Sequence, residues 1–146
     1  ERLRVIMSPL FPVIGFDIGG TKIAVCVAMS DGTILASERL PVHADVRYMD
    51  VLAQMAAAGN RLIKQAGLRR ADIAACGICA PGPLDVANGR ILQSPNMPFA
   101  NVPVRDELAE KLGIPVFFDN DANEIKAQGH RQDSANGRSQ MTRNKC

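Results

Sequence analysis

Two short apolar segments, separated by a few small and polar residues, stand near the start of the chain in GFDIGGTKIAV, residues 15–25. Segments of this length rich in Val, Ile and Phe predict β-strands, and a turn with two glycines between them predicts an antiparallel hairpin. We expect strands at 13–18 and 22–29, and a third strand at 33–40 after the turn Ser30-Asp31-Gly32. The chain is therefore predicted to begin as three antiparallel strands.

The hydrophobic period changes after the third strand. Apolar residues recur three and four positions apart between residues 48 and 66, which predicts a helix. Asp45 or Asp50 stands near the start of this helix, and Gly67 marks its end. A short apolar run at 73–80 then predicts a buried central strand.

A loop, a second helix and a last strand are expected next. The segment APGPLDVANGRILQSPNMP, residues 80–98, is rich in Pro, Gly and Asn, which predicts a loop with a tight turn at Asn88-Gly89. We expect a helix at 102–112 that is capped by Asn101 and ended by Gly113, followed by a strand at 116–118. The order β-β-β-α-β-α-β predicts an α/β fold, a mixed sheet with helices against it.

Composition excludes several classes of partner. With 146 residues, 47% of them hydrophobic, the chain can form one domain with a core, and it has no apolar run of the ~20 residues that a membrane span needs. Residues 124–146 carry five basic and two acidic side chains, so the formal net charge of +2 leaves about −1 on the rest of the chain. We therefore expect no nucleic-acid or membrane partner and a cytoplasmic location.

The CxxC motif Cys76-Gly77-Ile78-Cys79 lies inside the apolar run expected to be a strand. In a strand, residues three apart point to opposite faces and lie about 10 Å apart. They could share neither a metal ion nor a disulfide without breaking the strand. We interpret these cysteines as small buried apolar residues.

The turn of the first hairpin has the residues of a phosphate site. Asp17 ends the first strand, and the glycine pair Gly19-Gly20 can adopt φ > 0 and expose backbone N–H groups to an anion. Thr21 and Lys22 add a hydroxyl group and a cation. A carboxylate beside bound phosphate is expected where Mg²⁺ lies between them. The alternative is a plain hairpin with a solvated Asp17.

A second candidate site is FFDNDAN, residues 117–123. Asp121 follows the last strand at the expected start of a helix, whose N-terminus favours an ionised carboxylate. Such a group could accept a proton from a substrate hydroxyl, with Asn120 binding neighbouring hydroxyls. In the alternative interpretation, Asp119, Asp121 or Asn123 only caps a helix. The loop APGPLD with SPNM suits a sugar-binding rim, although other long surface loops have similar composition.

Taken in order, GFDIGGTKIAV, GICAPGPLD, GRILQSPNMP and LAEKLGIPVFFDNDAN resemble the amino-terminal lobe of the ROK family of sugar kinases and sugar-responsive repressors. The resemblance runs from residue 13 to 123. It implies a ribonuclease-H-like, actin-like ATPase lobe, which we place at 12–128 between a leader at 1–11 and a tail at 129–146. We expect that polar tail to be disordered and non-native.

The resemblance also implies a reaction and its site. The reaction is ATP-dependent phosphorylation of a hydroxyl of a hexose or N-acetylhexosamine, with Mg²⁺ near Asp17. Asp121 matches the catalytic base. The residues that match the phosphate motif are Asp17, Gly19, Gly20, Thr21 and Lys22; those that match the sugar site are Gly82, Asn96, Asn120 and Asp121.

From Glu124 onward the resemblance ends, and the family's second glycine-rich strand and zinc motif do not follow. We therefore expect the amino-terminal half of a sugar kinase, inactive alone, with structural zinc only in the missing half and a homodimer for the full-length protein. The first alternative is the sugar-sensing domain of a ROK repressor. The second is a small nuclease in which Asp17, Asp85 and Asp121 hold two metal ions.

Overall fold

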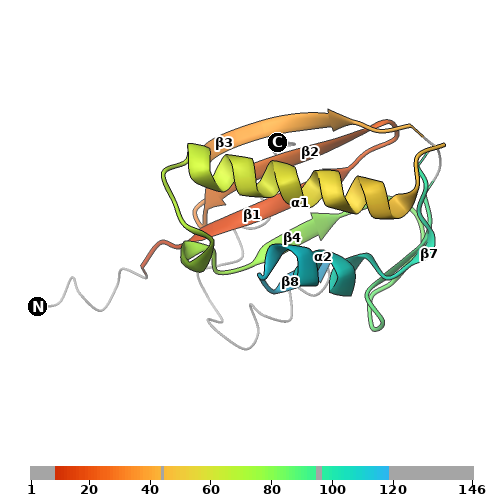
Figure 1. Ribbon diagram of the computed structural model, residues 1–146. Coiled ribbons are helices and arrows are strands. Elements are labelled where there is room, and N and C mark those ends of the chain that lie inside the picture. The colour runs from red at the N-terminus through yellow and green to blue at the C-terminus, as the bar shows by residue number, and fades with distance from the viewer. Residues whose placement is uncertain (1–8, 44, 95–96, 119–146) are drawn as a thin grey trace, which may run out of the picture.

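A five-stranded mixed sheet forms the centre of the protein (Figure 1). The computed structural model describes residues 9–43, 45–94 and 97–118. The strand order is β3-β2-β1-β4-β8, in which β1–β2 and β2–β3 are antiparallel pairs and β1, β4 and β8 run parallel. The strands are β1 (Pro12–Ile18), β2 (Lys22–Met29), β3 (Ile34–Pro41), β4 (Cys76–Cys79) and β8 (Val116–Phe118).

The two α-helices of the described residues, α1 (Tyr48–Gln65) and α2 (Val104–Leu112), cover the same face of this sheet (Figure 1). Alternate residues of the strands point to that face, as the period of two requires. Phe16 of β1 lies beside Val25 of β2 and Ile78 of β4 in the ladder, and all three are buried. Together with the apolar stripes of the helices they form the hydrophobic core.

Gly59 allows α1 to lie close to the sheet. A Cβ atom at this position would come within 2.8 Å of Cδ1 of Ile14 and 3.3 Å of Cδ2 of Leu112. The glycine is therefore a contact point between α1, β1 and α2. Helix propensity alone makes it a weak point of α1, because glycine costs about 1 kcal/mol relative to alanine; packing explains its presence.

The segment expected to be a loop at 80–98 instead contains strands. A second, three-stranded antiparallel sheet has the order β5-β6-β7, with β5 (Leu84–Asp85), β6 (Arg90–Gln93) and β7 (Ala100–Val102). Strands this short show almost no alternation, so the Pro and Gly signals dominate the sequence pattern. The tight turn at Asn88-Gly89 is confirmed, with φ +69° at Gly89.

Two expected element boundaries are corrected. The strand expected at 73–80 is limited to β4, Cys76–Cys79, and a 3₁₀ turn at Arg70–Asp72 lies before it. Asn101 does not cap α2: it belongs to β7, has φ 55°, and its side-chain and backbone oxygens accept hydrogen bonds from Arg90. The N-cap is Pro103, which has no side-chain capping bond.

Other expected elements are confirmed. The first three strands and β8 agree with the sequence within a residue at each end. Helix α1 ends at Gln65, and Gly67, which has φ +74°, follows its C-cap residue; the N–H of Gly67 donates to Lys64 O and that of Leu68 donates to Ile63 O, a Schellman motif. Gly113, with φ +66°, ends α2.

Cys76 is fully buried on β4, as the sequence predicts, and burial raises the pKa of its thiol well above the ordinary value. Such a thiol stays protonated at neutral pH and is a poor nucleophile. Among the described residues, no helix combines the length and apolar character that crossing a membrane requires. The leader expected at 1–11 lies largely outside the described residues, and the tail expected at 129–146 lies wholly outside them.

Candidate functional site

The parallel strands β1, β4 and β8 end at one edge of the main sheet. In the ladder, Asp17 pairs with Cys79, and Ile78 pairs with Phe118, so the last residues of the three strands lie nearly level. Because neighbouring strands are about 4.8 Å apart, the ends of β1 and β8 are separated by about 10 Å. Ligands of such sheets bind outside the carboxyl ends of parallel strands.

The β1–β2 turn at residues 19–22 projects from this edge. The N–H of Gly19 donates to the backbone oxygen of Lys22 at 2.8 Å, and the oxygen of Thr21 accepts from the N–H of Val42 at 2.9 Å. Neither glycine of the pair has a positive φ, so the turn does not use the left-handed conformation that the sequence allowed. Gly19 is needed for another reason: a Cβ there would lie 3.0 Å from Lys22 O.

Gly20 leaves open space where a phosphate could approach. A Cβ at this position would have no atom within 4 Å, and Gly20, Thr21 and Lys22 are all exposed. Within the described part of the chain, the N–H groups of Gly20 and Thr21 donate to no backbone acceptor. Two uncovered amides, a hydroxyl and an ammonium group form a donor set that fits an anion such as the terminal phosphates of ATP.

Asp17 is the next-to-last residue of β1, beside this turn. It lies between two buried residues, Phe16 and Ile18, that point to the helices, so its half-buried side chain points to the opposite face of the sheet. Among the described residues, no hydrogen bond or ion pair engages its carboxylate. A carboxylate in this position suits a hard cation such as Mg²⁺.

Gly82 follows β4 at the same edge, and its backbone conformation explains why this residue is glycine. Its φ is +84°, and a Cβ would lie 2.7 Å from the backbone oxygen of Gln93. Gly82 therefore has a structural role.

Ser94 is a feature that sequence reasoning treated only as part of the SPN loop. The residue is 5% exposed, its N–H donates to Phe99 O, and its Oγ has no hydrogen-bond partner among the described residues. A buried, unpaired hydroxyl is costly in a folded protein. Only tertiary burial reveals this, because serine is ordinarily a surface residue.

Asn96, Asn120 and Asp121, three of the predicted sugar-site residues, lie outside the described residues. The chain leaves β8 after Phe118 at the edge where β1 and β4 end. The structure thus brings Asp17, the turn at 19–22, Gly82 and Phe118, the last described residue, to one edge.

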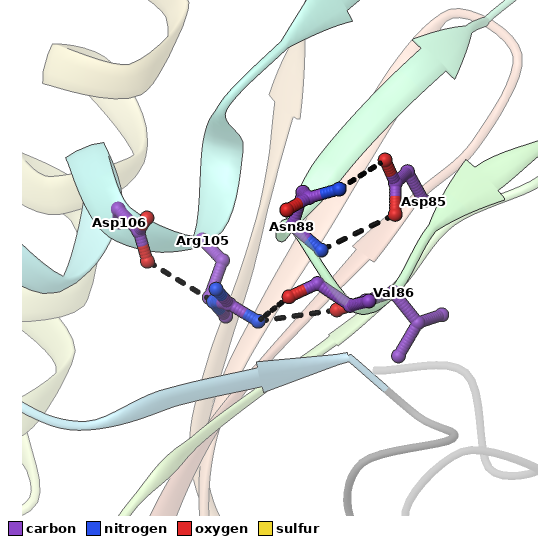
Figure 2. A network of polar contacts seen from close by, with 6 residues as sticks. Asp85, Val86, Asn88, Arg105 and Asp106 are labelled. Atoms are coloured by element: carbon purple, nitrogen blue, oxygen red, sulfur yellow. Dashed lines mark hydrogen bonds and ion pairs between the residues drawn. The ribbon is translucent and has the colours of Figure 1, made fainter.

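Asp85, which the nuclease alternative requires as a metal ligand, instead stabilises the turn that follows it (Figure 2). Its carboxylate accepts hydrogen bonds from the side chain of Asn88 at 2.8 Å and from the backbone N–H of Asn88 at 3.2 Å. These bonds, with smaller contributions from Arg90 and Arg105, hold the pKa of Asp85 below its usual value. Within the described ranges, no group of three or more His, Cys, Asp or Glu side chains is arranged to hold a metal ion.

Comparison with known proteins identifies the family. The sequence model of the ROK family matches residues 13–141, and a glucokinase from Thermotoga maritima is 35% identical over 116 residues, 79% of this chain. The chain belongs to the ROK family. The family match extends past Asn123, farther along the chain than the resemblance traced from the motifs.

Solved structures of the ROK family share the fold. A ROK hexokinase from Thermus thermophilus has a TM-score of 0.67 and 36% identity, covering 87% of this chain and 41% of that one. A ROK glucokinase from Streptomyces griseus, in complex with glucose and AMPPNP, has a TM-score of 0.64 and 30% identity, with coverage of 83% and 38%. The chain therefore has the actin-like ATPase fold of ROK sugar kinases.

The family contains regulators as well as kinases. A xylose repressor from Caldicellulosiruptor bescii is 27% identical over 111 residues, 76% of this chain and 28% of the repressor. The chain spans about a third of the length of the curated relatives it matches, including 35% of the Thermotoga glucokinase. Family membership is thus compatible with catalysis and with sugar sensing.

Proposed function

We propose that this chain supplies the phosphate-binding lobe of an ATP-dependent kinase that phosphorylates a hydroxyl group of a hexose or N-acetylhexosamine. The observation that carries the proposal is the uncovered turn at residues 19–22, which lies at the edge where β1, β4 and β8 end. A related ROK glucokinase binds glucose together with AMPPNP, which supports the use of a nucleotide here.

The first half of the site holds the phosphates. The amides of Gly20 and Thr21 and the ammonium group of Lys22 bind the terminal phosphates, and Asp17 binds Mg²⁺. When bound, ATP supplies the phosphoryl group and Mg²⁺ neutralises part of the phosphate charge. Gly19 maintains the turn through its bond to Lys22 O. Phosphoryl transfer depends chiefly on such positioning and charge neutralisation.

The second half of the site holds the sugar. Asp121 accepts the proton of the attacking hydroxyl, a contribution that typically accelerates a reaction about 10²–10⁴-fold. Asn120, Asn96 and the backbone at Gly82 orient the sugar. The short separation expected between the ends of β1 and β8 supports this division of roles.

A second candidate function is the sugar-sensing domain of a ROK repressor, which the similarity to the xylose repressor favours. Such a domain binds a sugar but needs no nucleotide. The uncovered phosphate-type turn favours the kinase, and nucleotide binding discriminates the two functions.

A glycine substitution tests the kinase proposal. We expect AMPPNP with Mg²⁺ to shift the amide NMR signals of Gly20 and Thr21, and Gly20→Val to weaken this binding at least about tenfold, because its side chain enters space that phosphate requires. The melting temperature should change little, since that space is open. Thr33→Val, in the exposed turn at the other end of β2, is the matched control. Equal nucleotide binding by Gly20→Val and the control would overturn the proposal.

A further inference from the structure

The turn between β5 and β6 is tied to the first residues of α2 (Figure 2). Nη1 of Arg105 donates to the backbone oxygens of Val86 at 3.1 Å and Ala87 at 3.5 Å. The backbone N–H of Arg105 donates to the oxygen of Gly89 at 3.1 Å. Arg105, in the first turn of α2, thus donates hydrogen bonds to the carbonyl oxygens of three turn residues.

The fit between Arg105 and this turn is close. Gly89 has φ +69°, and a Cβ there would lie 2.5 Å from Nε and 2.8 Å from Cβ of Arg105. Nε donates to Asp106 at 3.0 Å, and the Arg105 side chain is only 25% exposed whereas that of Asp106 is 69% exposed. A guanidinium group that donates hydrogen bonds from two of its nitrogen atoms has a fixed orientation, because its planar donors are fixed relative to one another.

The opposite end of the same strand pair lies at the candidate sugar rim. The N–H of Leu92 donates to Pro83 O at 3.1 Å, and Gly82 lies close against the backbone of Gln93. Ser94 follows immediately. The strand pair is therefore a short rod with the Arg105 contacts at one end and Gly82 and Ser94 at the other.

The middle of this strand pair packs against the hydrophobic core. Ile91 of β6 is fully buried in the hydrophobic core, as are Leu108 and Leu112 of α2. An apolar contact alone permits small rotations, since it is not directional. Hydrogen bonds at the turn remove that freedom, and bonds from a charged donor are the stronger kind.

We propose that Arg105 is a positioning residue for the sugar site: it locks the turn at 86–89 onto α2 and thereby fixes the orientation of Gly82 and Ser94 at the rim. The inference rests on the proposed function only for the identity of the ligand at the rim. The lock itself follows from the contacts of Arg105.

Amide hydrogen exchange on the full chain tests the lock. We expect Arg105→Met to accelerate exchange at Leu92 and Ser94 about tenfold or more, because charged hydrogen bonds at the turn are lost. Arg105→Lys, which keeps the charge and can reach one carbonyl group, should restore part of the protection. Arg69→Met is the matched control, since among the described residues the side chain of that arginine pairs with Asp72 alone, near the other end of β4, and is 83% exposed. Unchanged exchange in both Arg105 variants would overturn the lock.

Ligand binding tests the positioning role. We expect Arg105→Met to weaken glucose binding about tenfold while AMPPNP binding stays within about twofold of the unsubstituted chain, because the phosphate turn belongs to β1 and β2. Faster exchange with unchanged glucose affinity would overturn the positioning role. A chain that binds neither ligand would instead refute the proposed function, and the exchange experiment would still decide whether the lock exists.

Discussion

At the scale of single residues, two glycines of the candidate site differ in what requires them. Gly82 needs its positive φ and its closeness to Gln93 O for the fold alone, whereas Gly20 has neither constraint and lies in open space. A glycine without a structural reason is the better marker of a ligand. Gly20 therefore carries more weight in the functional argument than Gly82.

The Asp85 turn gives a prediction about pH. The hydrogen bonds from Asn88 lower the pKa of Asp85 from 3.8, so their stabilising effect is present above that pH and is lost as the pH falls through the lower folded-state pKa. We expect an NMR titration of the Asp85 carboxyl group to give a midpoint below 3.8, accompanied by a shift of the Asn88 amide signal. In Asp85→Asn the acid-dependent shift at Asn88 should vanish. A carboxyl midpoint at or above 3.8 would contradict the turn geometry.

At the scale of elements, the sequence pattern located the long strands and α1 but missed the small sheet. The period of α1 is strong because its buried stripe runs from Val51 to Ile63, more than three turns of helix. Strands of two to four residues, such as β5, β6 and β7, are too short for alternation to be recognised. The prediction that Asn101 is the N-cap of α2 is wrong for the same reason, since that residue belongs to the short strand β7.

Gly59 gives a prediction about how α1 packs. Gly59→Ala should gain about 1 kcal/mol of helix propensity but lose about 1–3 kcal/mol to overpacking, because buried Ile14 and Leu112 must move. We expect a net loss of about 1 kcal/mol in the free energy of urea unfolding. The control is Ala57→Gly on the exposed side of α1, which changes propensity without packing. A more stable Gly59→Ala variant would show that α1 does not lie as close to the sheet as described.

At the scale of the whole molecule, the two sheets share one core. Ile91 and Val102 of the small sheet belong to the same apolar cluster as Phe16 and Ile78 of the main sheet. The small sheet therefore packs on the main sheet, which carries the turn at residues 19–22.

This shared core predicts one cooperative unfolding transition. Ile91→Ala and Ile78→Ala should each reduce the free energy of unfolding by about 2–5 kcal/mol, because each removes a fully buried side chain. Urea unfolding followed by circular dichroism measures this loss. Separate melting of the small sheet in Ile91→Ala would contradict a shared core.

Catalysis is a property of a complete cleft. We expect negligible sugar-dependent ADP release from these 146 residues alone, because one wall of a site can neither exclude water nor enclose the nucleotide. A coupled ADP-release assay with glucose and with N-acetylglucosamine measures it. Turnover at the rate of a complete kinase, abolished by Asp121→Asn, would contradict this prediction and show that these residues are sufficient for catalysis.

The sequence by itself determined the positions of the long strands, the period of α1, the glycines that follow both helices and the glycine-rich composition of the turn at residues 19–22. These are local properties, fixed by side-chain spacing and by backbone conformations that few residues adopt. Only the tertiary structure decided that β4 and β8 lie parallel to β1 with level ends, that Gly59 is a packing contact, and that Arg105 binds the turn between β5 and β6. Those features depend on strand order and on contacts between segments distant in sequence, for which no local pattern carries a signal.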